Sequence, residues 1–381
     1  MRTRRIARPA TVMVGVGVLV AAASLLPAQA IGTVPVVSST STITTIAGNG
    51  VYGFAGDGGL ASGALIAKPR DTAMGPDGSL YVSDTYNNRI RKIDPAGVIT
   101  TVAGNGVGAY AGDNGPATSA SIKWPHDVTI GPDGCLYIAD SNNNRIRKVD
   151  LNGIITTVAG TGTGGYNGDN RLATTARLRN PKSVAFYGPD LYIADSMNHR
   201  IRKVDSVTGI ITTVAGTGVA AFSGDGGPAT AAAMNTPQRI AFDTLGNLFL
   251  TDTANNRIRR VDVTTGVIST IAGNGVSGYS GNGGLAVKAA LKTPRGITVV
   301  NDNVVYISDS GNHRVRMVSL DSGIITTIAG TGSTSYTGDG GPAGAAGLYN
   351  PRGLTTNDAG DLIVADTFHN AIRLIAVSPI Q

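Results

Sequence analysis

The stretch DTYNNRIRKID, Asp84 to Asp94, decides the fold because the chain repeats it. Near copies read DSNNNRIRKVD, DSMNHRIRKVD, DTANNRIRRVD and DSGNHRVRMVS, and a divergent sixth copy reads DTFHNAIRLIA. The copies begin at Asp84, Asp140, Asp195, Asp252, Asp309 and Asp366, at steps of 55 to 57 residues. A nearly constant step of this length is typical of a protein built from repeated structural units.

Two further motifs recur in step with the first. One resembles ITTIAGNG and begins at Ile43, Ile99, Ile155, Ile211, Ile268 and Ile325. The other is a proline that precedes a short apolar run, at Pro69, Pro125, Pro181, Pro237, Pro294 and Pro351. Six copies of all three motifs therefore predict six equivalent units.

Each unit reads as four short strands, which we call a to d. In the second unit these are HDVTI, CLYIAD, RIRKVD and IITTVAG, separated by GPDG, the SNNN corner and LNG. β-Branched runs bounded by Gly, Pro, Asn and Asp are typical of strands joined by tight turns. Four antiparallel strands at this period predict an all-β fold, a six-bladed β-propeller with one blade per unit.

The two ends of the repeat region predict that the ring closes on itself. The first motif encountered is a lone strand d, STITTIAG, and the last is a strand c, NAIRLIA. If the first strand completes the last blade, two exposed sheet edges disappear. We therefore expect residues 42–377 to form one closed propeller, with 31–41 as a linker and 378–381 as a tail.

The composition agrees with a fold of many turns and little helix. The 381 residues include 53 Gly, and all 25 acidic residues are Asp, which favours turns and caps, while Glu favours helices. The single cysteine, Cys135, makes an intrachain disulfide impossible. We interpret Cys135 as a partly exposed structural residue rather than a reactive thiol.

The first thirty residues have the pattern of a secretory signal peptide, residues 1–30. Four arginines precede an apolar run from Val12 to Leu26, and AQA follows at Ala28 to Ala30. An uncleaved anchor is the alternative, although the run is shorter than a membrane span of about 20 residues. Cleavage lowers the formal net charge from +6 to +2. We expect a secreted, extracellular monomer with no nucleic-acid partner and no membrane span after cleavage.

The corner motif resembles the NHL repeat. NHRI at Asn198 to Ile201 and NHRV at Asn312 to Val315 lie within the pattern D-x-x-N-x-R-[IV]-R, with Arg where the family name has Leu. The resemblance covers nearly all of residues 42–377, and the GDGGPA loop is similar to that of bacterial exported NHL-repeat proteins. It implies the propeller fold. It implies little about function, because such proteins include binding scaffolds, sensor domains and a few enzymes.

The repeated Asp and Arg of the corner are interpreted as structural. A carboxylate here can accept backbone N–H bonds in an Asx-type turn or pair with the Arg five residues later. A catalytic group is needed once, whereas five units keep both residues. The structural set is Asp84, Arg89, Asp140, Arg145, Asp195, Arg200, Asp252, Arg257, Asp309 and Arg314. In the sixth unit Ala371 replaces the Arg, so we expect Asp366 to lose its local partner.

The GDGG loops carry one aromatic residue and, in five copies, one acid. The aromatics are Phe54, Tyr110, Tyr166, Phe222, Tyr279 and Tyr336; the acids are Asp57, Asp113, Asp169, Asp225 and Asp339, with Asn282 in the fifth copy. Their repetition indicates packing and turn structure. A calcium site is the alternative, but calcium takes six to eight oxygens and usually several acids. We expect no cofactor, with calcium as the one candidate.

Six side chains are expected at one mouth of the central channel, because strand a is innermost and each directly follows the proline. They are Arg70, His126, Lys182, Gln238, Arg295 and Arg352. They differ between units, as a site does, and none is acidic. An anionic ligand bearing a carboxylate or phosphate fits this set. The alternative is that they pair with acids such as Asp71 and Asp127, or face water.

Two functions remain open on the sequence. The first is a non-catalytic scaffold that binds a protein or glycan partner through the face carrying the b–c and d–a loops. The second is a metal-dependent hydrolase or lyase, because six-bladed relatives include lactonases and amidating lyases with a channel metal. The chain has four His and no Glu, and only His126 is placed at the channel, so an Asp/Asn site is the remaining form of this alternative. No catalytic residue stands out.

Overall fold

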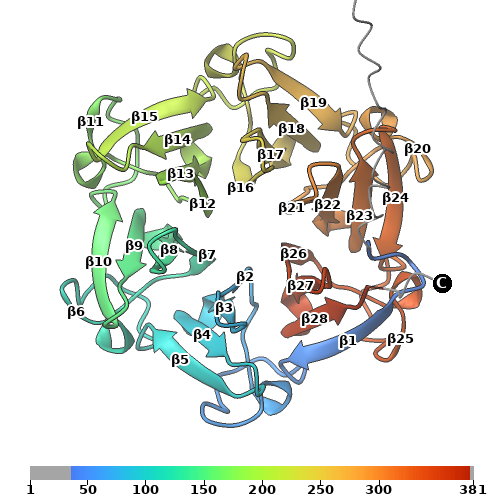
Figure 1. The fold of residues 1–381 in the computed structure, drawn as a ribbon, viewed down its shortest axis with the longest axis horizontal. Helices are drawn as coiled ribbons and strands as arrows, with labels where there is room; N and C mark the ends of the chain where they lie inside the picture. Colours follow the sequence, from blue (N-terminus) through green and yellow to red (C-terminus); the bar gives the residue numbers. More distant parts are fainter. Residues whose placement is uncertain (1–35, 378–381) are drawn as a thin grey trace, which may run out of the picture. The chain divides into compact units, whose positions relative to one another are not determined.

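The computed structural model describes residues 36–377, which form six antiparallel sheets around a common centre (Figure 1). This confirms the predicted six-bladed β-propeller. The predicted signal peptide, residues 31–35 of the predicted linker and the predicted tail lie outside the described residues. Among residues 36–377, no helix is long and apolar enough to cross a bilayer.

The blades follow one another along the chain. Blade I comprises β2 (Thr72–Met74), β3 (Leu80–Asp84), β4 (Arg89–Ile93) and β5 (Ile99–Ala103). Blade II comprises β7 (Pro125–Ile130), β8 (Leu136–Asp140), β9 (Arg145–Val149) and β10 (Ile154–Ala159). Blade III comprises β12 (Ser183–Tyr187), β13 (Asp190–Asp195), β14 (Arg200–Val204) and β15 (Ile210–Ala215).

The second half repeats the pattern. Blade IV comprises β16 (Pro237–Phe242), β17 (Leu248–Asp252), β18 (Arg257–Val261) and β19 (Ile268–Ala272). Blade V comprises β21 (Gly296–Val300), β22 (Val304–Asp309), β23 (Arg314–Ser319) and β24 (Ile324–Ala329). Blade VI comprises β26 (Pro351–Thr356), β27 (Leu362–Asp366), β28 (Ala371–Ile375) and the N-terminal β1 (Thr42–Ala47).

The ring closes as the sequence predicts. β1 pairs antiparallel with β28, with Ile43 opposite Ile375 and Ala47 opposite Ile372. The strand a of each blade contacts the strand a of the next, and β26 returns to β2 (Figure 1). Strand a is therefore innermost, and the b–c corners and d–a loops share one face, which we call the long-loop face.

The GDGG loops add structure beyond the four predicted strands. In four blades the loop leading into the blade forms a short fifth strand outside strand d: β6 (Gly115–Pro116), β11 (Arg171–Leu172), β20 (Gly284–Leu285) and β25 (Gly341–Pro342). A one-turn 3-10 helix lies in every loop: η1 (Ala61–Gly63), η3 (Ala117–Ser119), η5 (Ala173–Thr175), η7 (Ala229–Ala231), η9 (Ala286–Lys288) and η11 (Ala343–Ala345).

Each b–c corner is a second 3-10 turn that ends in a left-handed residue. These are η2 (Thr85–Asn87), η4 (Ser141–Asn143), η6 (Ser196–Asn198), η8 (Thr253–Asn255), η10 (Ser310–Asn312) and η12 (Thr367–His369). The residue after η2, Asn88, has φ 51°. An Asn or His with a positive φ also follows each of the other five corners. Asn tolerates this conformation better than most residues, which explains its repetition.

The hydrophobic core lies between neighbouring blades. One cluster joins Ile363 and Ile372 of blade VI to Val82 and Ile99 of blade I, with Ile66 of the connecting loop inside it. Five similar clusters occupy the other blade boundaries. Cys135 is buried in the cluster between blades II and III, so its predicted partial exposure is wrong: the a–b turn packs this side chain inward.

Candidate functional site

The corner Asp is buried, and its ion pair is with a different arginine from the one predicted. Asp84 is fully buried and lies 3.3 Å from Nη1 of Arg91, two residues beyond Arg89. Arg91 is fully buried, whereas Arg89 donates to the carbonyl oxygens of Asn87 and Asn105. The predicted Asp84–Arg89 ion pair is therefore wrong. Both arginines project from the same face of strand c, because residues two apart share a face, and the ion pair forms with the one that is buried beside Asp84.

The predicted Asx-type turn is also wrong in detail. Asp84 accepts the backbone N–H of Ala67, which lies 17 residues earlier in the loop, and the side-chain amide of Asn87. The same pattern recurs at Asp140, with Lys123 N–H and Asn143. Each carboxylate therefore ties the incoming loop to the corner, and burial raises the pKa of Asp84 to about 6 in spite of these partners.

Blade VI keeps its buried pair, contrary to expectation. Asp366 lies 3.3 Å from Nη1 of Arg373 and 2.8 Å from Nδ1 of His369. The prediction that Asp366 loses its partner assumed that Ala371 stands in the pairing position. That position belongs to Arg373, so the sixth copy conserves the interaction.

The GDGG loops complete the buried arginine sites. Asp57 lies 2.7 Å from Nη2 of Arg91, and the ring of Phe54 lies 3.7 Å from the guanidinium carbon of Arg89. The equivalent acid pairs with the equivalent arginine in blades II, III, IV and VI. These loop acids are thus occupied by guanidinium groups. Across residues 36–377 no cluster of three or more His, Cys, Asp or Glu side chains is arranged to hold a metal.

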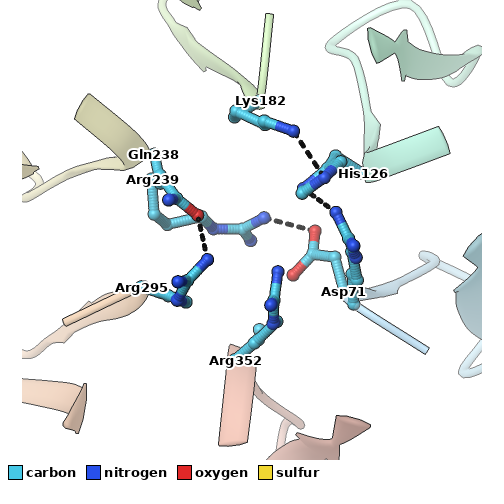
Figure 2. A pocket seen from close by; sticks show the side chains of 9 residues that line it. Asp71, His126, Lys182, Gln238, Arg239, Arg295 and Arg352 are labelled. Carbon is cyan, nitrogen blue, oxygen red and sulfur yellow. Dashed lines mark hydrogen bonds and ion pairs between the residues drawn. The ribbon is translucent and has the colours of Figure 1, made fainter. Parts of the chain in front are cut away.

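The six side chains predicted at the channel mouth do come together. Arg70, His126, Lys182, Gln238, Arg295 and Arg352 line one pocket on the long-loop side of the channel (Figure 2). Each follows the proline that begins the inner edge of its blade. The space open to a water-sized group is about 20 Å³, which holds about one such group and is too small for a whole sugar or nucleotide.

The contacts within this mouth leave positive donors facing one another. Lys182 Nζ lies 2.6 Å from His126 Nε2, and Arg70 Nη1 lies 3.3 Å from His126 Nδ1. A neutral imidazole accepts one hydrogen bond and carries a proton on its other nitrogen. The two basic side chains therefore share one imidazole, which offers a single acceptor when it is neutral.

No carboxylate in the described chain forms an ion pair with these mouth residues. Arg295 Nη1 donates to Gln238 Oε1 at 3.5 Å, and Arg352 Nε donates to Asn350 Oδ1 at 3.0 Å. Arg352 and His126 are 8% and 7% exposed, so their positive character is recessed. Burial and the neighbouring positive groups lower the pKa of Lys182 and of His126 well below their usual values.

Arg239, in a second layer of the channel one residue further along strand a, was missed by the sequence analysis. It reaches across the channel and pairs with Asp71 (Figure 2), and it also pairs with Asp127. The signal was available, because the residue two places after each proline is Asp in blades I and II and Arg in blade IV. The expected alternative, in which the mouth cations pair with Asp71 and Asp127, is wrong because Arg239 occupies both carboxylates.

This arrangement bears on the metal alternative. Asp71 and Asp127 are the channel carboxylates within residues 36–377, and a guanidinium lies between them where a divalent cation needs oxygen ligands. Burial raises the pKa of Asp71, and Arg239 offsets part of that shift. The Asp/Asn set therefore does not fit a channel metal.

The remaining acids lie on the opposite face. Asp77, Asp94, Asp133, Asp150, Asp190, Asp205, Asp243, Asp262, Asp302, Asp321, Asp358 and Asp361 all stand at a–b or c–d turns. Four of them pair with basic residues of strand c: Asp77, Asp133, Asp190 and Asp262. The tight-turn face is thus acidic, and the inner part of the long-loop face is basic.

Parts of the chain match family models. The NHL repeat model matches residues 67–93 and 291–316, and the Teneurin NHL domain model matches residues 105–166. The chain is 31% identical over 252 residues to SUPPRESSOR OF QUENCHING 1, chloroplastic, of Arabidopsis thaliana, covering 63% of this chain and 24% of the relative. It is 31% identical over 277 residues to Teneurin-1 of Gallus gallus, covering 63% and 10%. The chain thus spans a quarter or less of these relatives.

Solved structures share the fold at low identity. An auxiliary nutrient binding protein from Bacteroides ovatus superimposes with a TM-score of 0.65 at 16% identity, covering 89% of this chain and 77% of that one. A gluconolactonase from Xanthomonas campestris superimposes with a TM-score of 0.54 at 12% identity, covering 82% and 87%. At such identities the likeness concerns the fold alone.

Proposed function

Because the chain is a six-bladed β-propeller of NHL repeats, we propose that it is a non-catalytic scaffold that binds an anionic group of its ligand at the channel mouth. The ligand is a protein or glycan that docks on the long-loop face. The observation that carries this proposal is the convergence of five basic side chains and one glutamine on a recessed point, where the carboxylate that also lines the pocket, Asp71, pairs with Arg239 and not with them. Such a cluster costs folding free energy unless an anion binds it.

The nutrient-binding name of one structural relative is consistent with a binding role. A catalytic role has less support, because the channel carboxylates are bonded to Arg239 and a hydrolase or lyase of this fold needs ligands for its metal. We also propose that the protein is exported, on the basis of the signal-peptide pattern in residues 1–30. N-terminal sequencing of protein recovered outside the native cell tests this proposal, and an intact N-terminus inside the cell contradicts it.

The binding proposal is tested by calorimetry with sulfate and citrate as probes. The triple variant Arg70→Ala, Arg295→Ala, Arg352→Ala should lose anion binding by about tenfold or more. A matched control, Arg177→Ala, Lys288→Ala, Lys292→Ala, removes the same charge from exposed sites and should bind normally. The mouth variant should melt no lower than the parent, because it removes unpaired cations. Equal binding by both triple variants would contradict the proposal.

A further inference from the structure

Five aromatic side chains and one lysine lie beside the channel mouth on the long-loop face. We call them the aromatic arc; its members are Tyr349, Phe368, Lys68, Tyr86, Trp124 and Tyr52. They come from the b–c corners of blades VI and I and from the loops that lead into blades VI, I and II. Several remain exposed: Tyr52 by 54%, Phe368 and Tyr349 by 37% each and Trp124 by 36%.

Neighbouring members of the arc contact one another along its length. Tyr349 and Phe368 meet edge to face at 4.9 Å, and Tyr86 and Trp124 stack at 5.0 Å with an interplanar angle of 22°. Lys68 joins the two pairs, with its Nζ 4.4 Å from the ring of Tyr86 and 5.3 Å from that of Phe368. The result is one continuous surface of rings with a cation in its middle.

The other blades show that the fold does not require these aromatics. The corner position of Tyr86 and Phe368 holds Asn142, Met197, Ala254 and Gly311 in blades II to V. The position of Trp124, before the proline, holds Asn180, Thr236, Thr293 and Asn350 in blades III to VI. The six blades share one backbone conformation, so comparing them shows that the fold does not need aromatic residues at these positions. These aromatic rings occur only on one side of the mouth.

The backbone at Trp124 does not explain the choice of a large aromatic side chain. Its φ is 50°, and the residue at this position is left-handed in every other blade. Asn, which blades III and VI carry there, tolerates this conformation better than Trp does. The indole instead stacks on Tyr86 and stays 36% exposed, which is typical of a surface that contacts a ligand.

Arg70 links the arc to the channel mouth, because it contacts side chains of both. The guanidinium carbon of Arg70 lies 5.6 Å from the ring of Tyr86 and 6.0 Å from that of Trp124, while its Nη1 contacts His126 inside the mouth. The corner carboxylates next to Tyr86 and Phe368 in the chain belong to Asp84 and Asp366, and both are fully buried and paired. A partner that fits this surface carries negative charge and rings with an apolar face.

We propose that the aromatic arc and the channel mouth together bind an acidic oligosaccharide, with one carboxylate in the mouth and successive sugar rings on the arc. This inference rests on the proposed function. The C–H face of a pyranose ring packs on an aromatic surface, and a uronate carries its carboxylate directly on that ring. Trp and Tyr supply such contact area with little loss of side-chain entropy.

The position of the charges favours an acidic sugar over a single-stranded nucleic acid. A polynucleotide is bound by cations that follow its phosphates along a groove. Here the cations converge on one point, where Arg352 and His126 are almost fully buried. One protruding carboxylate fits this point, whereas a continuous phosphate backbone does not enter it.

The test measures binding of tetragalacturonate, galacturonate, neutral cellotetraose and a ten-nucleotide oligo(dT) to the purified chain. Trp124→Asn introduces the residue that blade III has at this position, and Tyr86→Ala introduces the residue that blade IV has at its corner. Both variants should therefore fold. Met197→Ala, at the corner of blade III, is the matched control. We expect tetragalacturonate to bind about tenfold more tightly than galacturonate or cellotetraose.

The arc variants should lose about tenfold in affinity for tetragalacturonate and keep their affinity for galacturonate and sulfate, while Met197→Ala changes neither. Unchanged tetragalacturonate binding by both arc variants overturns the inference. Sulfate binding without any preference for the tetramer overturns it too, but leaves the proposed function standing. Absence of all anion binding overturns the proposed function itself. Tighter binding of oligo(dT) than of tetragalacturonate, lost in Trp124→Asn, overturns the sugar assignment.

Discussion

The Nζ atom of Lys182 lies 2.6 Å from Nε2 of His126, so two basic side chains from neighbouring blades are in hydrogen-bond contact. Burial is the main cause that lowers the pKa of His126, and the positive charges of Arg70 and Lys182 lower it further. Burial is also the main cause that lowers the pKa of Lys182, and the positive charges of Arg70 and Arg352 add to it. The free mouth therefore holds fewer protons than the same side chains in water.

Anion binding at the mouth should be accompanied by proton uptake. A bound anion stabilises the protonated forms of His126 and Lys182 and raises both pKa values. The form that binds better is the protonated one, so affinity for sulfate should rise as the pH falls from 8 to 6. Calorimetry in buffers of different ionisation enthalpy measures the protons taken up. His126→Gln, which copies Gln238 of blade IV, should reduce the uptake; pH-independent affinity of the parent would contradict the prediction.

Blade V should gain stability from a single substitution. Its loop carries Asn282 where the other five have Asp, so the buried Arg316 keeps its corner ion pair with Asp309 at 3.6 Å and lacks the second ion pair that the loop acid makes in the other blades. Asn282→Asp should supply the missing ion pair and stabilise the fold by about 1 kcal/mol. The melting temperature should rise by roughly 1 to 3 °C.

The matched change in blade IV runs in the opposite direction. Asp225 lies 2.7 Å from Nη2 of Arg259, so Asp225→Asn should lower the melting temperature by a similar amount. Thermal unfolding followed by circular dichroism measures both variants. If Asn282→Asp lowers the melting temperature, the loop acids do not stabilise the buried arginines.

Ring closure by β1 should make a large contribution to stability. Deleting Thr42 to Gly48 removes the strand beside β28 and exposes the buried face on which Ile43 packs. The melting temperature should fall by at least roughly 10 °C, because a ladder and part of a core cluster are lost. A peptide of residues 36–48 added in trans should restore part of the loss. An unchanged melting temperature in the deletion variant would show that the ring does not need this strand.

The sequence was sufficient for the architecture because every repeat motif occurs six times, and a repeated signal tolerates local errors. Closure followed from the unpaired strand at each end, Thr42–Ala47 and Ala371–Ile375. The mouth residues followed from a single geometric rule, namely that the residue after each proline begins the innermost strand. These predictions depend on period and strand order, which a sequence displays directly.

What the sequence did not reveal depends on contacts across the chain. The corner motif contains two arginines on one face of strand c, and only the folded structure shows that the buried Arg91 rather than Arg89 meets Asp84. Arg239 bonds to residues more than 100 positions away. The aromatic arc combines corner, loop and pre-proline positions from three blades. No local pattern relates such positions, so their proximity emerges only from the folded ring.

His369 should give blade VI a pH-dependent stability that the other blades lack. Its Nδ1 lies 2.8 Å from Asp366 and its Nε2 lies 2.7 Å from the carbonyl oxygen of Thr334, so both nitrogens face acceptors. Burial is the largest single influence and opposes protonation, but the hydrogen bond to Asp366, the negative charge of Asp366 and the bond to Thr334 together outweigh it and raise the pKa of His369. Because the folded-state pKa is above the unfolded value, the stabilisation is complete below about pH 6.5 and is lost as the pH rises through the folded-state pKa.

The variant His369→Asn isolates this effect, because Asn occupies the same corner position in the other five blades and donates to the same carboxylate without titrating. The difference in unfolding free energy between the parent and the variant should be largest near pH 6 and should shrink towards pH 8.5. Other titrating groups are common to both proteins and cancel in this difference. Denaturant unfolding at a series of pH values measures it. A constant difference across that range would mean that folding does not change the pKa of His369, which would contradict the prediction.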